Sequence, residues 1–268
     1  MSLQSILEPL PHNPLWANER DEARELQQSL LPAAMLEGPA CEVAYRFSPF
    51  FEVGGDFADF FHMPDGRIGI YLGDVVGKGL PAAMYGVLVM GMLRGIHKTG
   101  QDTGTALTIL NQRLMVRPVA GRYSATLYAV FEPKTLQLTF SNAGLPHPLL
   151  VASSGCRKLG EGGLPSGLLQ DSSYETHSVQ LSPGDSVLFA TDGLHELRDH
   201  QDTDFSWEKL SEIWAQCRCK SARGSLDLIF EEAARFSRNG RQDDDMTAVV
   251  LKVPEHRASA FFPAATPQ

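Results

Sequence analysis

The order of the hydrophobic segments predicts an α+β protein in which antiparallel sheets are covered by pairs of helices. Strand-like runs occur in groups and do not alternate one-for-one with helices, which disfavours a doubly wound parallel sheet. Some runs, such as 186–190 and 248–251, are almost entirely apolar, as expected for strands covered on both faces. The 268 residues allow one large domain or two small ones, and the 43% hydrophobic content supports a substantial core.

The predicted elements follow in chain order. Residues 1–17 carry three prolines and are predicted to form an irregular arm. Residues 18–37 form an approach helix and linker, with Asn18 as the N-cap and Pro32 as the stop. A domain at 38–254 and a frayed tail at 255–268 complete the chain. Its strands are predicted at 42–47, 57–63, 67–72, 123–131, 136–142, 148–152, 174–179, 186–190 and 246–253, its later helices at 81–97, 103–116, 205–216 and 226–236, and a surface loop at 153–171.

The approach helix carries a narrow apolar stripe. Trp16, Ala23 and Leu30 are seven residues apart, with Leu26 between the last two. This spacing fits a coiled-coil-like dimer seam through residues 16–31, and it equally fits a helix docked on its own domain.

Charge and cysteine content narrow the class of protein. A formal net charge of −9 argues against nucleic-acid or anionic-membrane partners, which need a basic face. Four irregularly spaced cysteines are too few for a disulfide framework, so a cytoplasmic, reducing location is expected. The N-terminus does not resemble a signal peptide. The apolar stretch 80–93 is too short to cross a bilayer and is predicted to be a buried helix, so no membrane span is expected.

Four short acidic motifs, 54–56, 73–74, 191–193 and 243–245, lie at the edges of predicted strands. The neighbouring glycines let the backbone bend sharply and approach a ligand closely. Aspartates brought to one place by several strand ends repel each other unless a cation neutralises them. Because all of these ligands are oxygens, the motifs favour a hard ion such as Mg²⁺ or Mn²⁺.

Hard cations of this kind support metal-dependent phosphoester hydrolysis. Two ions can bridge a water, lower its pKa and neutralise charge on a phosphate oxygen. The chain has no Gly-x-Ser-x-Gly elbow, no phosphate-cradling cysteine loop and no P-loop, so no side-chain nucleophile is apparent.

Six segments of the chain together resemble one family, in the same order: 52–60, 73–79, 141–144, 181–185, 191–193 and 244–247. It is the bacterial SpoIIE/RsbU branch of the metal-dependent serine/threonine phosphatases, the PPM or type-2C class. The resemblance covers about residues 20–253. It implies a four-layer α/β/β/α sandwich of two antiparallel sheets flanked by helix pairs, with two Mn²⁺ or Mg²⁺ ions at one edge.

The resemblance also implies roles for individual residues. Asp74 would bridge both ions with the Val75 carbonyl as a further ligand. Asp192 and Asp244 would bind one ion, and Asp56 would bind the other, directly or through water. Asp243 and Asp245 would then be neighbours of the ligand set. The general acid stays open among His62, His147, His195 and a metal-bound water, and Lys78 is either a phosphate contact or a surface charge.

The sequence departs from the family pattern at three positions: Val76 replaces a small polar residue, Leu145 a histidine and His195 a threonine. None of these removes a predicted metal ligand. The resemblance implies hydrolysis of phosphoserine or phosphothreonine on a partner protein, typically a STAS-domain anti-sigma-factor antagonist in a partner-switching pathway.

Two rival readings are weaker. A catalytically silent scaffold of the same fold would be signalled by loss of a ligand aspartate, and all four are present. The diguanylate cyclase signature shares Gly54-Gly55-Asp56 but needs an acidic residue where this chain has Phe57.

Overall fold

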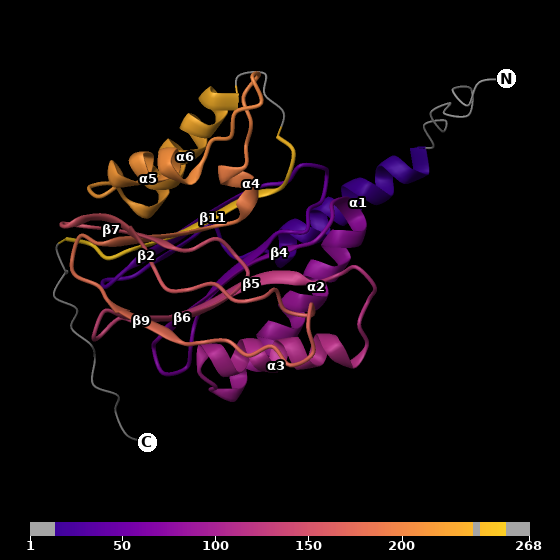
Figure 1. The fold of residues 1–268 in the computed structure, drawn as a ribbon, viewed down its shortest axis with the longest axis horizontal. Helices are drawn as coiled ribbons and strands as arrows, with labels where there is room; N and C mark the ends of the chain where they lie inside the picture. The colour runs from indigo at the N-terminus through magenta and orange to yellow at the C-terminus, as the bar shows by residue number, and fades with distance from the viewer. Residues whose placement is uncertain (1–13, 238–241, 256–268) are drawn as a thin grey trace.

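The structure, a computed structural model, describes residues 14–237 and 242–255 and has four layers (Figure 1). Two helices cover a six-stranded sheet, a five-stranded sheet packs beneath it, and two further helices cover the far face. Every pair of neighbouring strands is antiparallel. The α+β sandwich predicted from the sequence is confirmed.

The six-stranded sheet has the order β1-β2-β11-β10-β7-β8, and the five-stranded sheet has the order β3-β4-β5-β6-β9. The strands of the first sheet are β1 (Met35–Glu37), β2 (Glu42–Ser48), β11 (Met246–Lys252), β10 (Ser186–Ala190), β7 (Leu149–Ala152) and β8 (Gly155–Lys158). Those of the second sheet are β3 (Phe57–His62), β4 (Ile68–Val75), β5 (Ser124–Glu132), β6 (Gln137–Ala143) and β9 (His177–Gln180). The helices are α1 (Pro14–Leu30), α2 (Gly79–Ile96), η2 (His97–Thr99), α3 (Thr103–Val116), α4 (Asp192–His195), α5 (Trp207–Ala215) and α6 (Ala222–Ser237).

Three apolar layers hold the sandwich together. Side chains such as Phe189 and Ile70 fill the space between the two sheets. Trp214 of α5 lies in the layer between α5, α6 and the first sheet, and its indole N–H donates to the Leu149 carbonyl at 3.0 Å. Leu93 of α2 lies in the layer between α2, α3 and the second sheet. Central strands are therefore buried on both faces, which explains the nearly continuous apolar runs at 186–190 and 248–251.

Helix α2 covers the second sheet, as predicted for a buried helix. Among the described residues, 79–99 is the one helical segment long and apolar enough to cross a membrane, and 44% of its apolar window is buried inside the fold. Val89 and Leu93 on its inner face are almost fully buried. The hydroxyl of Tyr71 on β4 donates to the Leu93 carbonyl at 3.2 Å.

The structure differs from the predicted boundaries in several places. The approach helix begins at Pro14 and not at Asn18, so residues 14–17 do not belong to an irregular arm. Proline suits the first turn of a helix, where its missing N–H has no partner to lose. The predicted linker ends in β1, which pairs with β2, and the predicted loop 153–171 contains β8. Residues 1–13 and 256–268 lie outside the described residues, and the remaining division of the chain stays a prediction.

Helix α1 docks on the body of the molecule through its last turns. Gln27 is 9% exposed, and Leu30 packs against the layer under α2 and α3. The Arg94 guanidinium of α2 donates to the Leu30 carbonyl at 2.7 Å and pairs with Asp59 of β3 at 2.7 Å. Leu26 of the predicted stripe is 63% exposed. The docked arrangement is thus present, and it leaves one apolar position of the stripe open to solvent.

Candidate metal centre

Three of the four predicted aspartate ligands line one pocket at the ends of strands from both sheets. Asp74 is the penultimate residue of β4 in the five-stranded sheet. Asp192 follows β10 and opens α4, and Asp244 precedes β11 by one residue, so both come from the six-stranded sheet. The pocket has a volume of about 300 Å³. Its other lining residues are Val75, Val76, Gly77, Tyr123, Ala125, Gly144 and Pro165.

Asp56, the fourth predicted ligand, lies behind this pocket and is 1% exposed. It directly precedes β3, where Phe57 pairs with Gly73, so it stands beside Asp74. Its Oδ2 accepts hydrogen bonds from the Thr191 hydroxyl at 2.8 Å and the Thr247 hydroxyl at 2.6 Å. Both threonines flank the aspartates of the other sheet, and a buried carboxylate needs such donors.

Burial and the closeness of the aspartates disfavour the ionised form of these carboxyl groups. Burial, reinforced by Asp74 and then Asp245, raises the pKa of Asp56 well above its usual range. Burial, with Asp192 and Asp244 next in weight, raises the pKa of Asp74 to about 7. Burial and Asp244 also raise the pKa of Asp192. A site in which ionisation is disfavoured by like charge is stabilised by protons or by a cation.

The donor set fits a hard divalent ion, although the carboxylates lie in one region without forming an assembled ligand cluster. Among residues 14–237 and 242–255, no three His, Cys, Asp or Glu side chains form an assembled ligand cluster. Two of the carboxylates are engaged elsewhere, Asp56 with the two threonines and Asp244 with Lys78. Oxygen-only donors nevertheless match the preference of Mg²⁺ or Mn²⁺.

The predicted carbonyl ligand, Val75, lines the pocket as the last residue of β4. A Cβ atom on Gly55 would lie 2.9 Å from the Val75 oxygen and 3.1 Å from the Cβ of Ala82. Glycine at position 55 therefore allows the loop before Asp56 to pass close to the end of β4.

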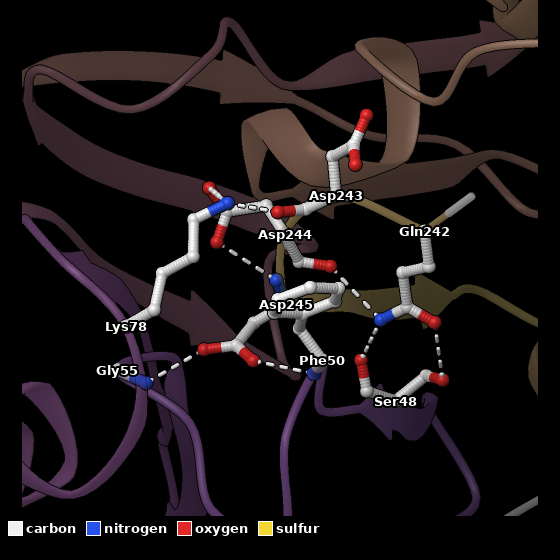
Figure 2. A network of polar contacts seen from close by, with 8 residues as sticks. All are labelled: Ser48, Phe50, Gly55, Lys78, Gln242, Asp243, Asp244 and Asp245. Carbon is white, nitrogen blue, oxygen red and sulfur yellow. Dashed lines mark hydrogen bonds and ion pairs between the residues drawn. The ribbon is translucent and has the colours of Figure 1, made fainter. Parts of the chain in front are cut away.

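The triple aspartate divides into residues with different contacts (Figure 2). Asp245 is 3% exposed, and its carboxylate accepts the backbone N–H groups of Phe50 at 2.7 Å and Gly55 at 2.6 Å. A Cβ atom on Gly54 would collide with this carboxylate. Asp245 thus fixes the loop that carries Asp56, whereas Asp244 alone of the three lines the pocket.

The backbone of this segment is fixed separately. The side-chain amide of Gln242 donates to the carbonyls of Ser48 at 2.7 Å and Asp244 at 2.9 Å (Figure 2). On the other side, a Cβ atom on Gly193 would collide with the Asp245 carbonyl. The Thr191-Asp192-Gly193 turn and the start of β11 are therefore in direct backbone contact.

The three histidines considered as general acids are absent from the residues that line the pocket. His62 ends β3 and is exposed. The ring of His195 stacks on Trp207 with centroids 4.6 Å apart, and burial lowers its pKa. The Nδ1 atoms of His147 and His195 are buried without a hydrogen-bond partner among the described residues. The geometry gives none of the three a place beside the carboxylates.

Sequence reasoning did not anticipate a polar contact between α1 and the loop before Asp56. The Gln27 side chain donates to the Gly54 carbonyl at 2.7 Å and accepts from the Gly54 N–H at 3.1 Å. This pair of bonds ties the approach helix to the residue two positions before a predicted ligand. No local sequence pattern predicts this contact, because its partners are brought together only when α1 docks on the domain.

Comparison with known proteins places the chain in a family. Residues 64–254 match the model of the family described as Stage II sporulation protein E (SpoIIE). The chain is 24% identical over 237 residues to the phosphoserine phosphatase RsbU of Bacillus subtilis, covering 88% of this chain and 70% of RsbU. It is 24% identical over 262 residues to the protein IcfG of Synechocystis, covering 87% of this chain but only 41% of IcfG.

Solved structures agree on the fold. The SiaA-PP2C domain of Pseudomonas aeruginosa superposes with a TM-score of 0.78 at 18% identity, covering 89% of this chain and 96% of that domain. The family match spans most of the sequence, and it includes Asp74, Asp192 and Asp244. The resemblance predicted from the motifs is confirmed, and the chain belongs to the SpoIIE family.

Proposed function

We propose that this chain is a metal-dependent protein phosphatase that hydrolyses phosphoserine or phosphothreonine on a partner protein. The observation that carries the proposal is the meeting of Asp74, Asp192 and Asp244 on one pocket, with two of their pKa values raised. Similarity to RsbU, a phosphoserine phosphatase, supports the same reaction class.

The proposed ligands are Asp74 between two Mn²⁺ or Mg²⁺ ions, the Val75 carbonyl beside it, Asp192 and Asp244 on one ion and Asp56 on the other. When bound, the ions would supply an activated water and would neutralise charge on the phosphoryl oxygens. The chain's own groups position these ligands. Thr191 and Thr247 hold the Asp56 carboxylate.

The test is hydrolysis of p-nitrophenyl phosphate and of a phosphoserine protein with and without Mn²⁺. Asp74→Asn should abolish the Mn²⁺-dependent rate, because an amide is a poor bridging ligand. The matched control is Asp227→Asn on α6, an exposed carboxylate that pairs with Arg46 across the surface. No Mn²⁺-dependent hydrolysis by the wild type would favour the catalytically silent scaffold, and equal rates in wild type and Asp74→Asn would refute the proposed centre.

The proposed substrate is a phosphorylated STAS-domain antagonist in a partner-switching pathway, as the family resemblance implies. The chain spans less than half of IcfG, so this partner is argued from the family and not from that whole protein. A phosphoproteomic comparison of cells with and without the gene tests it. Accumulation of a phosphoserine STAS-domain peptide in the deletion strain is expected, and an unchanged STAS phosphoproteome would contradict the assignment. The four free cysteines among the described residues agree with a cytoplasmic site of action.

We also propose that the chain forms a homodimer through the 16–31 helix. Leu26 of α1 is exposed, and α2 carries an exposed apolar row formed by Leu80, Met84 and Leu88. Light scattering should show that Leu26→Lys lowers the mass toward that of a monomer. Leu164→Lys, at a position 49% exposed between β8 and β9, is the control. An unchanged mass for Leu26→Lys would count against this seam.

A further inference from the structure

We infer that Lys78 is the internal counter-cation of the metal centre: its ammonium neutralises Asp244 in the metal-free chain and must leave Asp244 when an ion binds there. The inference rests on the proposed function, and it makes Lys78 a positioning residue that sets how tightly the Asp244 side of the centre takes up an ion.

Three groups hold the Lys78 ammonium in place (Figure 2). Its Nζ lies 3.0 Å from Oδ2 of Asp244 and donates a short hydrogen bond to the Asp243 carbonyl. The same atom lies 5.1 Å from the centre of the Phe50 ring, within the range of a cation–π contact. These partners come from the segments after β2 and before β11, so the lysine reaches across from the start of α2 to the other sheet.

The backbone around Lys78 directs its side chain toward this place. The residue is the N-cap of α2 with an extended backbone, and its side chain makes no capping hydrogen bond. It stands between Gly77 and Gly79, both of which have a positive φ. A side chain at Gly77 would also collide with the Arg122 guanidinium, which donates to the Val76 carbonyl. The two glycines let the Gly-Lys-Gly turn adopt this backbone without strain.

The Asp244 carboxylate cannot serve Lys78 and a metal ion together without cost. A coordinated Mg²⁺ or Mn²⁺ would stand roughly 2.1 Å from the ligand oxygen. An ammonium 3.0 Å from Oδ2 of Asp244 would then face a dication bound to that oxygen at close range, and the two positive charges would repel each other. The metal-free and metal-loaded chains must therefore differ in where Lys78 points.

The size of the effect follows from exposure. The side chains of Lys78 and Asp244 are 38% and 43% exposed, so their pair has the modest strength of a surface salt bridge. Because an ion must break this pair to bind Asp244, the presence of the pair weakens ion binding by about two- to fivefold. Replacing Lys78 by a neutral residue of similar length should therefore tighten ion binding by the same factor.

The experiment is calorimetric titration of the EDTA-stripped full chain with Mn²⁺. Lys78→Met should bind Mn²⁺ about two- to fivefold more tightly than the wild type, whereas Lys78→Arg should bind like the wild type because the charge is kept. Lys98→Met, at an exposed lysine after α2, is the control and should not change the affinity.

Thermal unfolding of the same proteins distinguishes the Lys78–Asp244 ion pair from long-range repulsion between Lys78 and the bound metal ion. If Lys78 stabilises the metal-free chain, Lys78→Met lowers the metal-free melting temperature and leaves the Mn²⁺-saturated one unchanged. If the lysine only repels the ion from a distance, the metal-free value stays and the saturated value rises, which overturns the counter-cation role.

Failure of the inference is distinct from failure of the proposed function. Equal or weaker Mn²⁺ affinity in Lys78→Met, with a wild type that binds Mn²⁺ and hydrolyses p-nitrophenyl phosphate, overturns the inference alone. A wild type that takes up no Mn²⁺ overturns both.

Discussion

Replacing Asp74 by asparagine should make the metal-free protein more stable at alkaline pH while destroying its metal site. In the folded chain, burial and the neighbouring Asp192 and Asp244 raise the pKa of Asp74 from 3.8 to about 7. The folded state therefore holds this proton more tightly than the unfolded state between those values. Stability from Asp74 is fully present below pH 4 and is lost as pH rises through 7.

The loss is large for a single side chain. Each pKa unit corresponds to about 1.36 kcal/mol, so the shift of Asp74 costs the ionised, metal-free chain up to about 4 kcal/mol at pH 8. An asparagine has no charge to penalise and escapes this cost. Asp74→Asn should therefore gain stability relative to the wild type between pH 5 and pH 8, and the gain should approach this value.

The assay is urea unfolding in EDTA at pH 5 and pH 8, with Asp227→Asn as the control for loss of an exposed carboxylate. The wild type should recover its stability at pH 8 when Mn²⁺ is added, and Asp74→Asn should not. A difference between wild type and Asp74→Asn that does not change with pH would refute the electrostatic reasoning. So would an Asp74→Asn protein that gains as much stability from Mn²⁺ as the wild type.

Two further predictions concern the supports of the centre. Gln27→Ala should lower the free energy of unfolding by about 1–3 kcal/mol in urea, because it leaves both backbone groups of Gly54 without their partners, while exposed Gln28→Ala should change it by less than about 0.5 kcal/mol. Equal effects would show that the α1 contact is not stabilising. Asp245→Ala should cost about 3 kcal/mol through its two lost backbone hydrogen bonds, whereas Asp244→Ala should chiefly weaken Mn²⁺ binding measured by calorimetry; the reverse ranking would exchange their roles.

Much of the fold could be predicted because the sandwich buries its strands on both faces. The runs at 186–190 and 103–116 coincide with β10 and α3, and the Asp65-Gly66 turn joins β3 to β4 as expected. Gly66 there has a φ of +89°, which glycine adopts without strain. Short strands at the sheet edges were not predicted, because they lack the apolar run of a strand that is buried on both faces. The residues of β8 are mostly exposed, so no apolar run marks it.

The candidate site, like the fold, could be predicted only in part from the sequence. Aspartates at strand ends could be predicted because each motif borders an apolar run and because Asp56, Asp74 and Asp192 stand beside a glycine. The polar partners that hold them could not, since Gln27 and Lys78 reach their partners over long separations in sequence. Thr247 is an intermediate case: it belongs to the Asp-Asp-x-Thr motif, but its bond to Asp56 depends on the packing of one sheet on the other.

The division of the four aspartates between the two sheets has a mechanical consequence. Asp56 and Asp74 move with the five-stranded sheet, and Asp192 and Asp244 move with the six-stranded sheet. Any shear of one sheet over the other would pull the two pairs apart, while rigid motion of either helix layer alone would not. An ion shared between the pairs would link the two sheets. The affinity of the chain for that ion would therefore depend on how well the two sheets are aligned.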